Sequence, residues 1–288
     1  MRRISWLLGL VGILIVPSLT AQTGLLVVAH GADSAWNARV QATMAQVRWS
    51  DGPVRLASMM GPEAETASME TQSRALATAG ARRVVVVPLM VSSFGGHTYD
   101  IQHAAAGHSG SMSGQMPGMA AHRLALPPAI AVQVTSALDS SSELGLALLA
   151  RWRELPAGDR ARPLVLVAHG PNSDVDALRW IDNLRAATRG LAAVLPDRAV
   201  HIGLLRDDAP APVRAGAVAG IRDTISALFT QRGDSVMVMT VLISSGAINN
   251  RTVPADLAGI PMHYAGAALA PDPAIARWIE RVASAVRW

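Results

Sequence analysis

One pattern occurs twice in this chain and constrains its fold more than any other feature. The apolar run Leu25–Val28 leads into Ala29-His30-Gly31, and the run Leu164–Val167 leads into Ala168-His169-Gly170. A short run made wholly of Val and Leu is typical of a strand that is buried on both faces of a parallel sheet. Ligands bind at the carboxyl ends of strands in open α/β sheets. The repetition therefore predicts a duplicated domain with a site between the two copies.

Helical and strand-like segments alternate after the first apolar run. The expected helices are Ala35–Val47 and Thr66–Ala79, where apolar residues recur at helical spacing. The expected strands are Val54–Met60 and Arg83–Met90, and the second of these is centred on four consecutive valines. This alternation predicts a parallel sheet with helices on both faces.

The second half of the chain repeats the same order of segments. Its expected elements, alternately helix and strand, are Ala177–Ala193, Val200–Leu205, Ala211–Gln231 and Ser235–Leu242. Each half is then expected to close with a short strand, near His122 in one and His263 in the other, and with a final helix. The final helices are expected to open with Pro128–Ile130 and Pro273–Ile275, because proline suits the first turn of a helix. The sequence thus predicts one α/β domain built twice.

The third predicted strand of each half ends in a polar segment. The segment is Ser92-Ser93-Phe94-Gly95-Gly96-His97 in the first half and Ser244-Ser245-Gly246-Ala247-Ile248-Asn249 in the second. The two segments align without a gap, so that Asn249 stands where His97 stands in the first half. The second half therefore lacks one of the two strand-end histidines.

The first residues have the order of a secretory signal. Arg2 and Arg3 precede the apolar stretch Trp6–Val16, and small residues follow as far as Ala21. The apolar stretch is shorter than the roughly 20 residues that a membrane-spanning helix needs. We therefore expect a signal segment over residues 1–21, a domain over 22–155 and a second domain over 156–288. Export to the periplasm or the extracellular space is the expected location, with an uncleaved membrane anchor as the alternative.

Composition excludes several classes of site. The chain has no cysteine, which excludes disulfides and thiolate metal ligands. Its basic residues are all arginine and the formal net charge is only +4, so a nucleic-acid partner has little support. Neither a G-x-S-x-G motif nor a phosphate-binding glycine motif follows any predicted strand. No nucleotide or redox cofactor is expected.

These motifs resemble the class II chelatase family of tetrapyrrole biosynthesis, in particular the two-domain sirohydrochlorin cobaltochelatases. The matching segments are Val27–Gly31, Val84–Leu89, Ser92–Ile101 and Val167–Gly170. The resemblance implies two tandem flavodoxin-like chelatase domains with the site in the cleft between them. Because Asn249 replaces the second histidine, we expect the first domain to carry the metal site and the second to be degenerate. A monomer is expected, because a two-domain chain closes its own cleft.

The resemblance implies insertion of a divalent metal ion, with Co²⁺ expected and Ni²⁺ or Fe²⁺ as alternatives, into a sirohydrochlorin-type ring. This chemistry needs a weak base and a neutral ligand that releases the metal. Imidazole can serve as both, because its pKa is ordinarily near 6.5 and it is a common metal ligand. By the resemblance, His30 and His97 are the metal ligands and proton acceptors. Glu63 is a candidate catalytic carboxylate after the second predicted strand.

A further group of polar and small residues is expected to bind the tetrapyrrole. The group comprises Ser34, Ser92, Ser93, Gly95, Gly96, His169 and Asn249. Each has a structural alternative: Ser34 and its counterpart Ser173 could cap the helices that follow, and the glycines could serve a tight turn.

A Gly/Ser-rich stretch over Gln102–His122 contains a second set of candidate metal ligands. The set comprises His103, His108, Met112, Met116, Met119 and His122. Thioether and imidazole groups suit soft and borderline metals, so this stretch is an accessory metal-binding candidate. The alternative is an unpacked insertion without a metal.

Two functions therefore remain open from the sequence. The chain is either a cobaltochelatase-like lyase or an exported metal- or tetrapyrrole-binding protein without turnover. The two differ in their need for His97, because only turnover requires both strand-end histidines.

Overall fold

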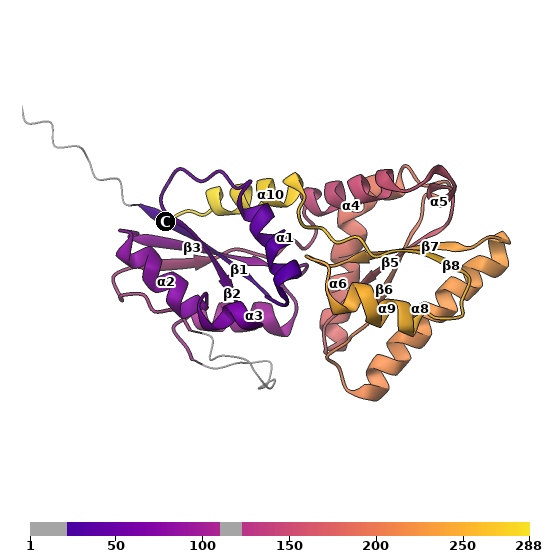
Figure 1. The fold of residues 1–288 in the computed structure, drawn as a ribbon, viewed down its shortest axis with the longest axis horizontal. Helices are drawn as coiled ribbons and strands as arrows, with labels where there is room; N and C mark the ends of the chain where they lie inside the picture. The colour runs from indigo at the N-terminus through magenta and orange to yellow at the C-terminus, as the bar shows by residue number, and fades with distance from the viewer. Residues whose placement is uncertain (1–21, 110–122) are drawn as a thin grey trace, which may run out of the picture.

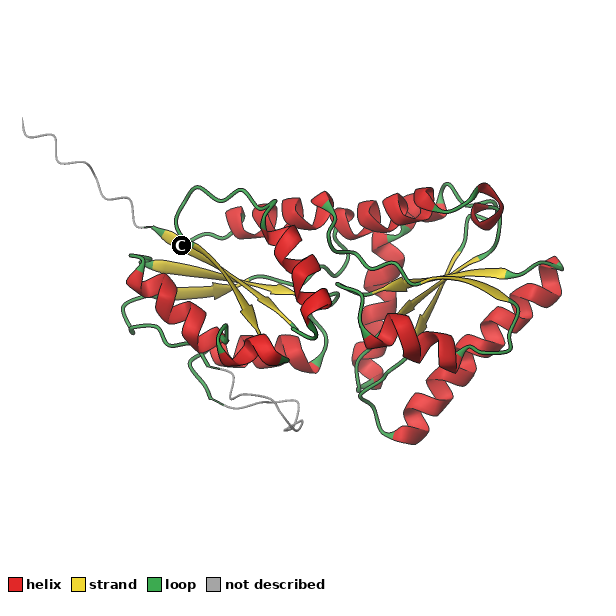
Figure 2. Ribbon diagram, in the orientation of Figure 1, coloured by secondary structure: helices red, strands yellow, loops and turns green. Residues whose placement is uncertain are grey.

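The computed structural model describes residues 22–109 and 123–288, and in this part of the chain two four-stranded parallel sheets are flanked by helices (Figures 1 and 2). The first half of the chain (residues 22–155) holds β1 Thr23–Ala29, β2 Val54–Ser58, β3 Arg83–Leu89 and β4 Ala131–Val134. The second half (residues 156–288) holds β5 Leu164–Ala168, β6 Val200–Leu204, β7 Val236–Val241 and β8 Met262–Ala265. The strand orders are β2-β1-β3-β4 and β6-β5-β7-β8. The predicted α/β fold, built twice, is confirmed.

The helices connect these strands. In the first half they are α1 Ser34–Met44, the 3₁₀ turn η1 Pro62–Glu65, α2 Met69–Thr78, α3 Gly96–Ala105 and α4 Ser142–Glu154. In the second half they are α5 Ala157–Arg160, α6 Asp174–Ala187, α7 Arg189–Ala192, α8 Ala211–Arg232, the π-helical turn η2 Ile248–Thr252, α9 Val253–Asp256 and α10 Pro273–Ser284. Among the described helices, no segment is long and apolar enough to cross a membrane.

The central strands are buried on both faces, which explains their continuous apolar sequences. Leu25–Val28 in β1 and Val84–Val87 in β3 have no exposed surface. Strands covered by helices on both sides need apolar residues at every position rather than at alternate ones. This burial leaves the polar strand ends, and not the strands themselves, available for contact with a ligand.

The first half closes differently from the prediction. Pro128–Ile130 leads into β4 rather than into a helix, and α4 begins only after Ser141. In the second half, Asp272 caps α10 by accepting a hydrogen bond of 2.8 Å from the Ala274 amide. In the first half the matching residue before Pro128 is Pro127, whose side chain cannot accept a hydrogen bond. A helix that began at Pro128 would therefore have no cap.

The predicted equivalence of His122 and His263 is also wrong. Val84 pairs with Val132 in the first sheet, as Val236 pairs with Met262 in the second. His263 therefore corresponds to Gln133, and His122 lies outside the described residues.

The last helix of each half packs against the other half. Helix α4 contacts α6 and α7, whereas α10 contacts β3 and α1, as the position of α10 over the first sheet shows in Figure 1. The two helices also contact each other, and Arg281 of α10 pairs with Glu143 of α4 at 2.6 Å. One apolar core consequently includes residues of both sheets, such as Val87 and Leu166. The predicted boundary after residue 155 lies between the segments that form the two sheets. The packing of α4 and α10 on the opposite halves nevertheless joins the two halves in space.

Candidate metal centre

The turn after β1 explains why a histidine and a glycine occur together. Gly31 has φ +80°, and a Cβ atom there would lie 2.3 Å from the carbonyl oxygen of Met60. Only glycine fits this left-handed position beside the backbone. The Gly31 carbonyl oxygen lies 2.7 Å from Nδ1 of His30. Since a carbonyl only accepts hydrogen bonds, Nδ1 carries the proton and Nε2 keeps a free lone pair.

The turn after β5 has the same geometry. Gly170 has φ +78°, and a Cβ atom there would lie 2.8 Å from Cβ of Leu204. Nδ1 of His169 lies 2.8 Å from the Gly170 carbonyl oxygen. The two repeats thus orient their first histidine by the same local device.

His97 lies beside His30 at the carboxyl edge of the first sheet. It stands in the first turn of α3, which follows β3, and β3 is hydrogen-bonded to β1. The ring centroids of His30 and His97 are 4.7 Å apart, and the rings meet edge to face at 80°. Nδ1 of His97 is buried and has no hydrogen-bond partner among the described residues. A buried imidazole nitrogen without a partner is well suited to hold a metal ion.

Both imidazoles of this pair are neutral at neutral pH. Burial is the main cause that lowers the pKa of His30 from its ordinary value. Burial, with the positive charge of His30 as the next cause, lowers the pKa of His97 to about 4. Desolvation disfavours the charged form, so protons do not compete with a metal for these nitrogens near pH 7.

A second pair, from the other half of the chain, faces the first. Nε2 of His169 lies 3.5 Å from Oδ2 of Asp208, in the loop after β6. The charge of Asp208 raises the pKa of both His30 and His97, and the charge of His169 lowers both. The four side chains therefore share one electrostatic environment between the halves.

Contacts on either side of these residues hold the carboxyl ends of the two sheets together. Trp180 of α6 donates its indole N–H to the carbonyl oxygen of Phe94, which precedes α3. Tyr99 of α3 donates to Oδ1 of Asp176 at 3.0 Å. Ser244, after β7, donates to the carbonyl oxygen of Trp36 at 3.0 Å. The histidines thus lie where strand ends of both halves meet.

The serine pair predicted to bind substrate is engaged in the protein's own loops. Ser92 is buried, and its hydroxyl accepts a hydrogen bond of 3.2 Å from the Phe94 amide. The hydroxyl of Ser93 donates to Oδ2 of Asp139 at 2.6 Å and accepts from the Ala137 amide at 2.9 Å. These contacts tie the loop before α3 to the loop before α4.

The residues around the helix starts have mixed outcomes. Ser34 is exposed in the first turn of α1, and the residue that caps this helix is Asp33. Its counterpart Ser173 caps α6, which is the structural role considered for it above. Gly95 precedes α3 and faces the Trp180 ring, and Gly96 begins that helix.

Asn249 is buried inside the second half. It is 1% exposed, and its Nδ2 donates to Oγ1 of Thr240 and to the Gly266 carbonyl oxygen, each at 2.8 Å. Tyr264 donates to its carbonyl oxygen at 2.6 Å. Asn249 therefore stands in an internal polar cluster of the second half, where its Oδ1 has no hydrogen-bond partner among the described residues, and its role in substrate binding stays a prediction.

Glu63 is not among the carboxylates whose charges act on His97. It stands in η1, where Oε1 accepts a hydrogen bond of 3.5 Å from Gln41. The carboxylates whose charges act on His97 are instead Asp208 and Asp100.

Asp208 was not predicted from the sequence, although its position after β6 corresponds closely to that of Glu63 after β2. In the paired registers, Ser58 is opposite Ala29 as Leu204 is opposite Ala168. Four residues later stand Pro62 in the first half and Asp208 in the second. This alignment places Asp208 one residue before the position that matches Glu63, which makes it a candidate carboxylate of the second half.

The accessory metal candidates are described only in part. His103, on α3, and His108 stack with ring centroids 4.6 Å apart and an interplanar angle of 23°. Met112, Met116, Met119 and His122 lie outside the described residues. Within residues 22–109 and 123–288, no group of three or more His, Asp or Glu side chains converges as a metal site.

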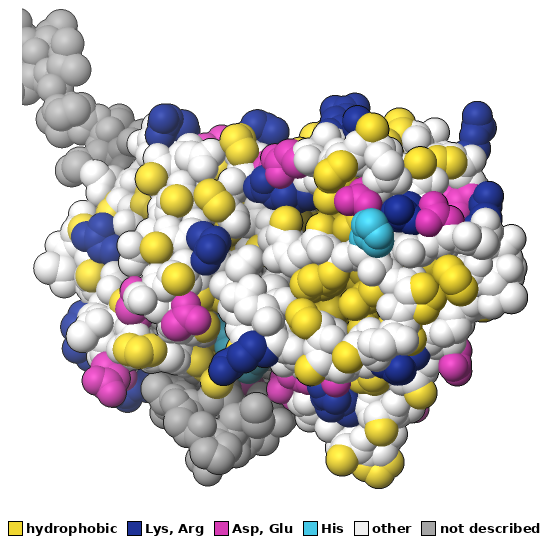
Figure 3. Space-filling view, turned by 45° about the vertical axis from the view of Figure 1, so that its right-hand side comes forward, with side chains coloured by type: hydrophobic (Ala, Val, Ile, Leu, Met, Phe, Trp, Pro, Cys, Tyr) yellow, Lys and Arg dark blue, Asp and Glu magenta, His cyan; other side chains and the backbone are white. Residues whose placement is uncertain are grey.

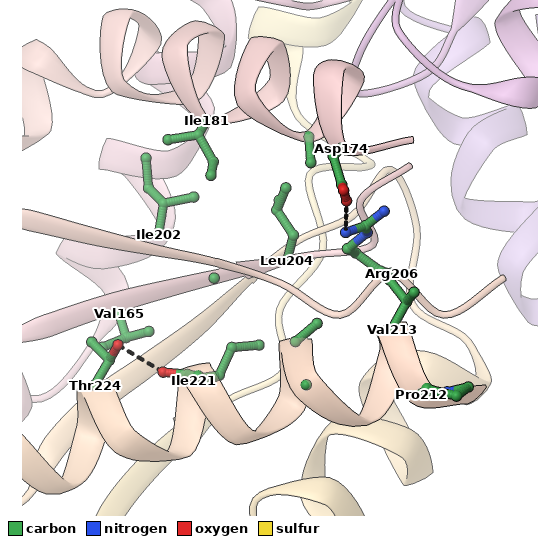
Figure 4. Close-up of a pocket in the computed structure, with 15 residues that line it drawn as sticks. Val165, Asp174, Ile181, Ile202, Leu204, Arg206, Pro212, Val213, Ile221 and Thr224 are labelled. Atoms are coloured by element: carbon green, nitrogen blue, oxygen red, sulfur yellow. Dashed lines mark hydrogen bonds and ion pairs between the residues drawn. The ribbon is translucent and has the colours of Figure 1, made fainter. Parts of the chain in front are cut away.

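An apolar pocket of about 510 Å³ lies elsewhere, at the β6 edge of the second sheet. Figure 4 shows Ile181 of α6 and Ile221 of α8 on either side of Ile202. Arg206 and Asp174 form an ion pair of 2.5 Å at its rim. Hydrophobic side chains gather in a hollow on the second half in Figure 3 as well. No histidine lines this pocket, so it is separate from the metal centre.

Comparisons with known proteins agree with this architecture. Residues 24–155 match the family model of CbiX, and this segment carries His30 and His97. The structure of SirB from Bacillus subtilis with Fe³⁺ is similar over 91% of this chain and 94% of that chain, with a TM-score of 0.61 and 16% sequence identity.

DR2241 from Deinococcus radiodurans, described as a multi-domain protein with structural similarity to chelatases, has a TM-score of 0.53 and 18% identity. The similarity covers 92% of this chain and 55% of that chain. At these identities the two structures show a shared fold. No curated protein sequence matches the chain.

Proposed function

Because residues 24–155 of this chain belong to the CbiX family of class II chelatases, we propose that the protein inserts a divalent metal ion into a sirohydrochlorin-type tetrapyrrole. The observation that carries the proposal is the edge-to-face pair of His30 and His97 at the carboxyl ends of β1 and β3. Two neutral imidazoles at this position can hold a metal ion and release it.

The reaction exchanges one metal ion for two protons. The divalent ion enters the ring and the two pyrrole N–H protons leave, so that no electron is transferred and no other reactant is needed. Imidazole binds borderline divalent ions without adding charge. With a pKa of about 4, His97 retains a proton poorly, so a ring proton accepted there would pass on to solvent. The low pKa supports the metal-ligand role of His97 more strongly than its role as a base.

We propose Co²⁺ as the metal, with Ni²⁺ and Fe²⁺ as alternatives, since imidazole ligands suit all three. The stacked His103 and His108 follow His97 on and after α3, and we propose them as an accessory point of metal capture. Export remains a proposal that rests on the order of Arg2, Arg3 and Trp6–Val16.

The test is metallation of sirohydrochlorin by the purified full chain, followed by absorbance with Co²⁺, Ni²⁺ and Fe²⁺ in turn. We expect turnover above the uncatalysed rate, lost in both His30→Ala and His97→Ala. His201→Gln, on β6, controls for the removal of a histidine outside the site.

If the wild-type rate equals that of buffer while metal or tetrapyrrole still binds, the chelatase proposal fails. A binding protein without turnover would then be the function. Equal rates in wild type and in both alanine variants would show that the His30–His97 pair is not the reactive site.

A further inference from the structure

Asp208 differs from the other carboxylates of its surroundings in its partner. Asp207 is paired with Arg214 at 2.7 Å, and Asp174 with Arg206 at 2.5 Å. Among the described residues, no arginine is paired with Asp208, and its Oδ2 lies 3.5 Å from Nε2 of His169, an imidazole that carries a positive charge only when it is protonated. Its negative charge is therefore not cancelled by a permanent positive charge.

Hydrogen bonds hold the loop that carries Asp208 close to the first half of the chain. The loop after β6 lies beside the turn after β5, where the Arg206 amide donates to the His169 carbonyl oxygen at 2.6 Å. Arg206 also holds that turn through the Pro171 carbonyl oxygen at 3.1 Å. The contacts of Trp180 with Phe94 and of Tyr99 with Asp176 fix the turn against the start of α3, which carries His97.

A carboxylate that favours a positive charge on two imidazoles also favours a cation bound to them. The contacts of Trp180 with Phe94 and of Tyr99 with Asp176 hold the strand ends of the second half, where Asp208 lies, against those of the first. The charge of Asp208 acts in this direction on both His30 and His97. A divalent ion carries twice the charge of a proton, so the interaction is doubled at equal distance. Since no three such side chains converge among the described residues, Asp208 acts through its charge and not as a third direct ligand.

We propose that Asp208, which lies beside His169 at the strand ends of the second half, supplies the negative charge that draws a divalent transition-metal cation to the His30–His97 pair, so that the metal centre is shared between the two halves of the chain. Asp208 is thus a positioning residue for the cation, and the second half contributes a charged side chain to the site. The inference rests on the proposed function only in treating the cation as the substrate.

The test is Co²⁺ binding to the full chain, measured by titration calorimetry at low and high salt. Asp208→Asn is expected to weaken binding about tenfold at low salt, the order expected for one charge acting on a divalent ion across a solvated cleft. The deficit should shrink at 0.5 M salt, because screening reduces a charge effect but not a structural one. Asp208→Glu should restore most of the affinity.

Asp207→Asn is the matched control, because it removes the same charge from the same loop while Asp256 keeps Arg214 paired at 2.7 Å. The proposal is overturned if Asp208→Asn binds Co²⁺ like wild type, if Asp207→Asn loses as much affinity, or if the deficit does not depend on salt. In the His30→Ala/His97→Ala background, Asp208→Asn should have no further effect.

The same proteins separate this inference from the proposed function. Weaker Co²⁺ binding in Asp208→Asn without any metallation by wild type would refute the chelatase function and leave the shared cation site. Metallation by wild type with unchanged binding in Asp208→Asn would refute the shared site alone.

Discussion

The lowered pKa of His97 predicts a defined loss of stability in acid. In the unfolded chain this imidazole titrates near its ordinary pKa of 6.5, whereas burial lowers its pKa in the folded protein to about 4. Below pH 6.5 the unfolded state therefore binds more protons than the folded state. The free energy of unfolding must therefore fall as the pH drops from about 6.5 towards 4. Above pH 6.5 this loss of stability is absent.

The magnitude follows from the size of the shift. Each unit of pKa difference corresponds to about 1.4 kcal/mol, so the full effect is about 3.5 kcal/mol and the part reached at pH 4.5 is about 2.5 kcal/mol. His97→Gln removes the titrating group and keeps a polar side chain of similar size. We expect the variant to lose about 2.5 kcal/mol less than wild type between pH 7.5 and pH 4.5.

The assay is urea unfolding of both proteins at pH 7.5, 5.5 and 4.5, with a chelator present so that no metal binds the folded state. Each protein is compared with itself at pH 7.5, which removes the baseline effect of the substitution. Carboxylates away from the pair titrate alike in both proteins and cancel in the difference. Because the charge of His30 is one cause of the lowered pKa of His97, the coupling between the two imidazoles is part of the measured difference. Parallel curves for the two proteins would refute the buried position of His97.

Three other substitutions test the surroundings of the site and the helix exchange. Gly31→Ala should cost at least about 2 kcal/mol and impair Co²⁺ binding, because φ is +80° and the new Cβ would meet the Met60 carbonyl; calorimetric titration and thermal unfolding check both effects. Gly145→Ala should lower stability by about 1–3 kcal/mol, because its Cβ would lie 2.1 Å from the Ala187 carbonyl oxygen, and an unchanged midpoint would contradict the contact of α4 with α6. Trp278→Ala, fully buried on α10, should cost about 3–5 kcal/mol and shift one transition common to both halves, as circular dichroism would show; a second, unshifted transition would argue against the shared core.

The central strands could be predicted because their burial leaves a clear sequence pattern. β1 and β5 are apolar at nearly every position, and a glycine with positive φ follows each of them. The His30–His97 pair followed from the resemblance to the chelatases, and the adjacency of β1 and β3 brings the two rings together.

The exchange of α4 and α10 could not be predicted from their own sequences. An amphipathic helix needs an apolar surface, but its pattern does not say which half of a duplicated chain provides that surface. The surroundings of Asn249 could not be predicted for a related reason. The alignment with His97 gave its position after β7, but not the hydrogen bonds with Thr240 and Gly266 that hold it inside the second half.

The helix exchange and the shared metal centre have a common physical basis. A charge on one half can favour a cation on the other only if their separation is fixed, because the interaction weakens with distance and with the entry of water. The core that joins Val87 to Leu166, with the α4–α10 contact beside it, supplies that rigidity. Once the halves are fixed, one of them can keep two histidines and the other a carboxylate. Duplication thus permits a site in which neither half retains the full set of groups, provided that their strand ends continue to face each other.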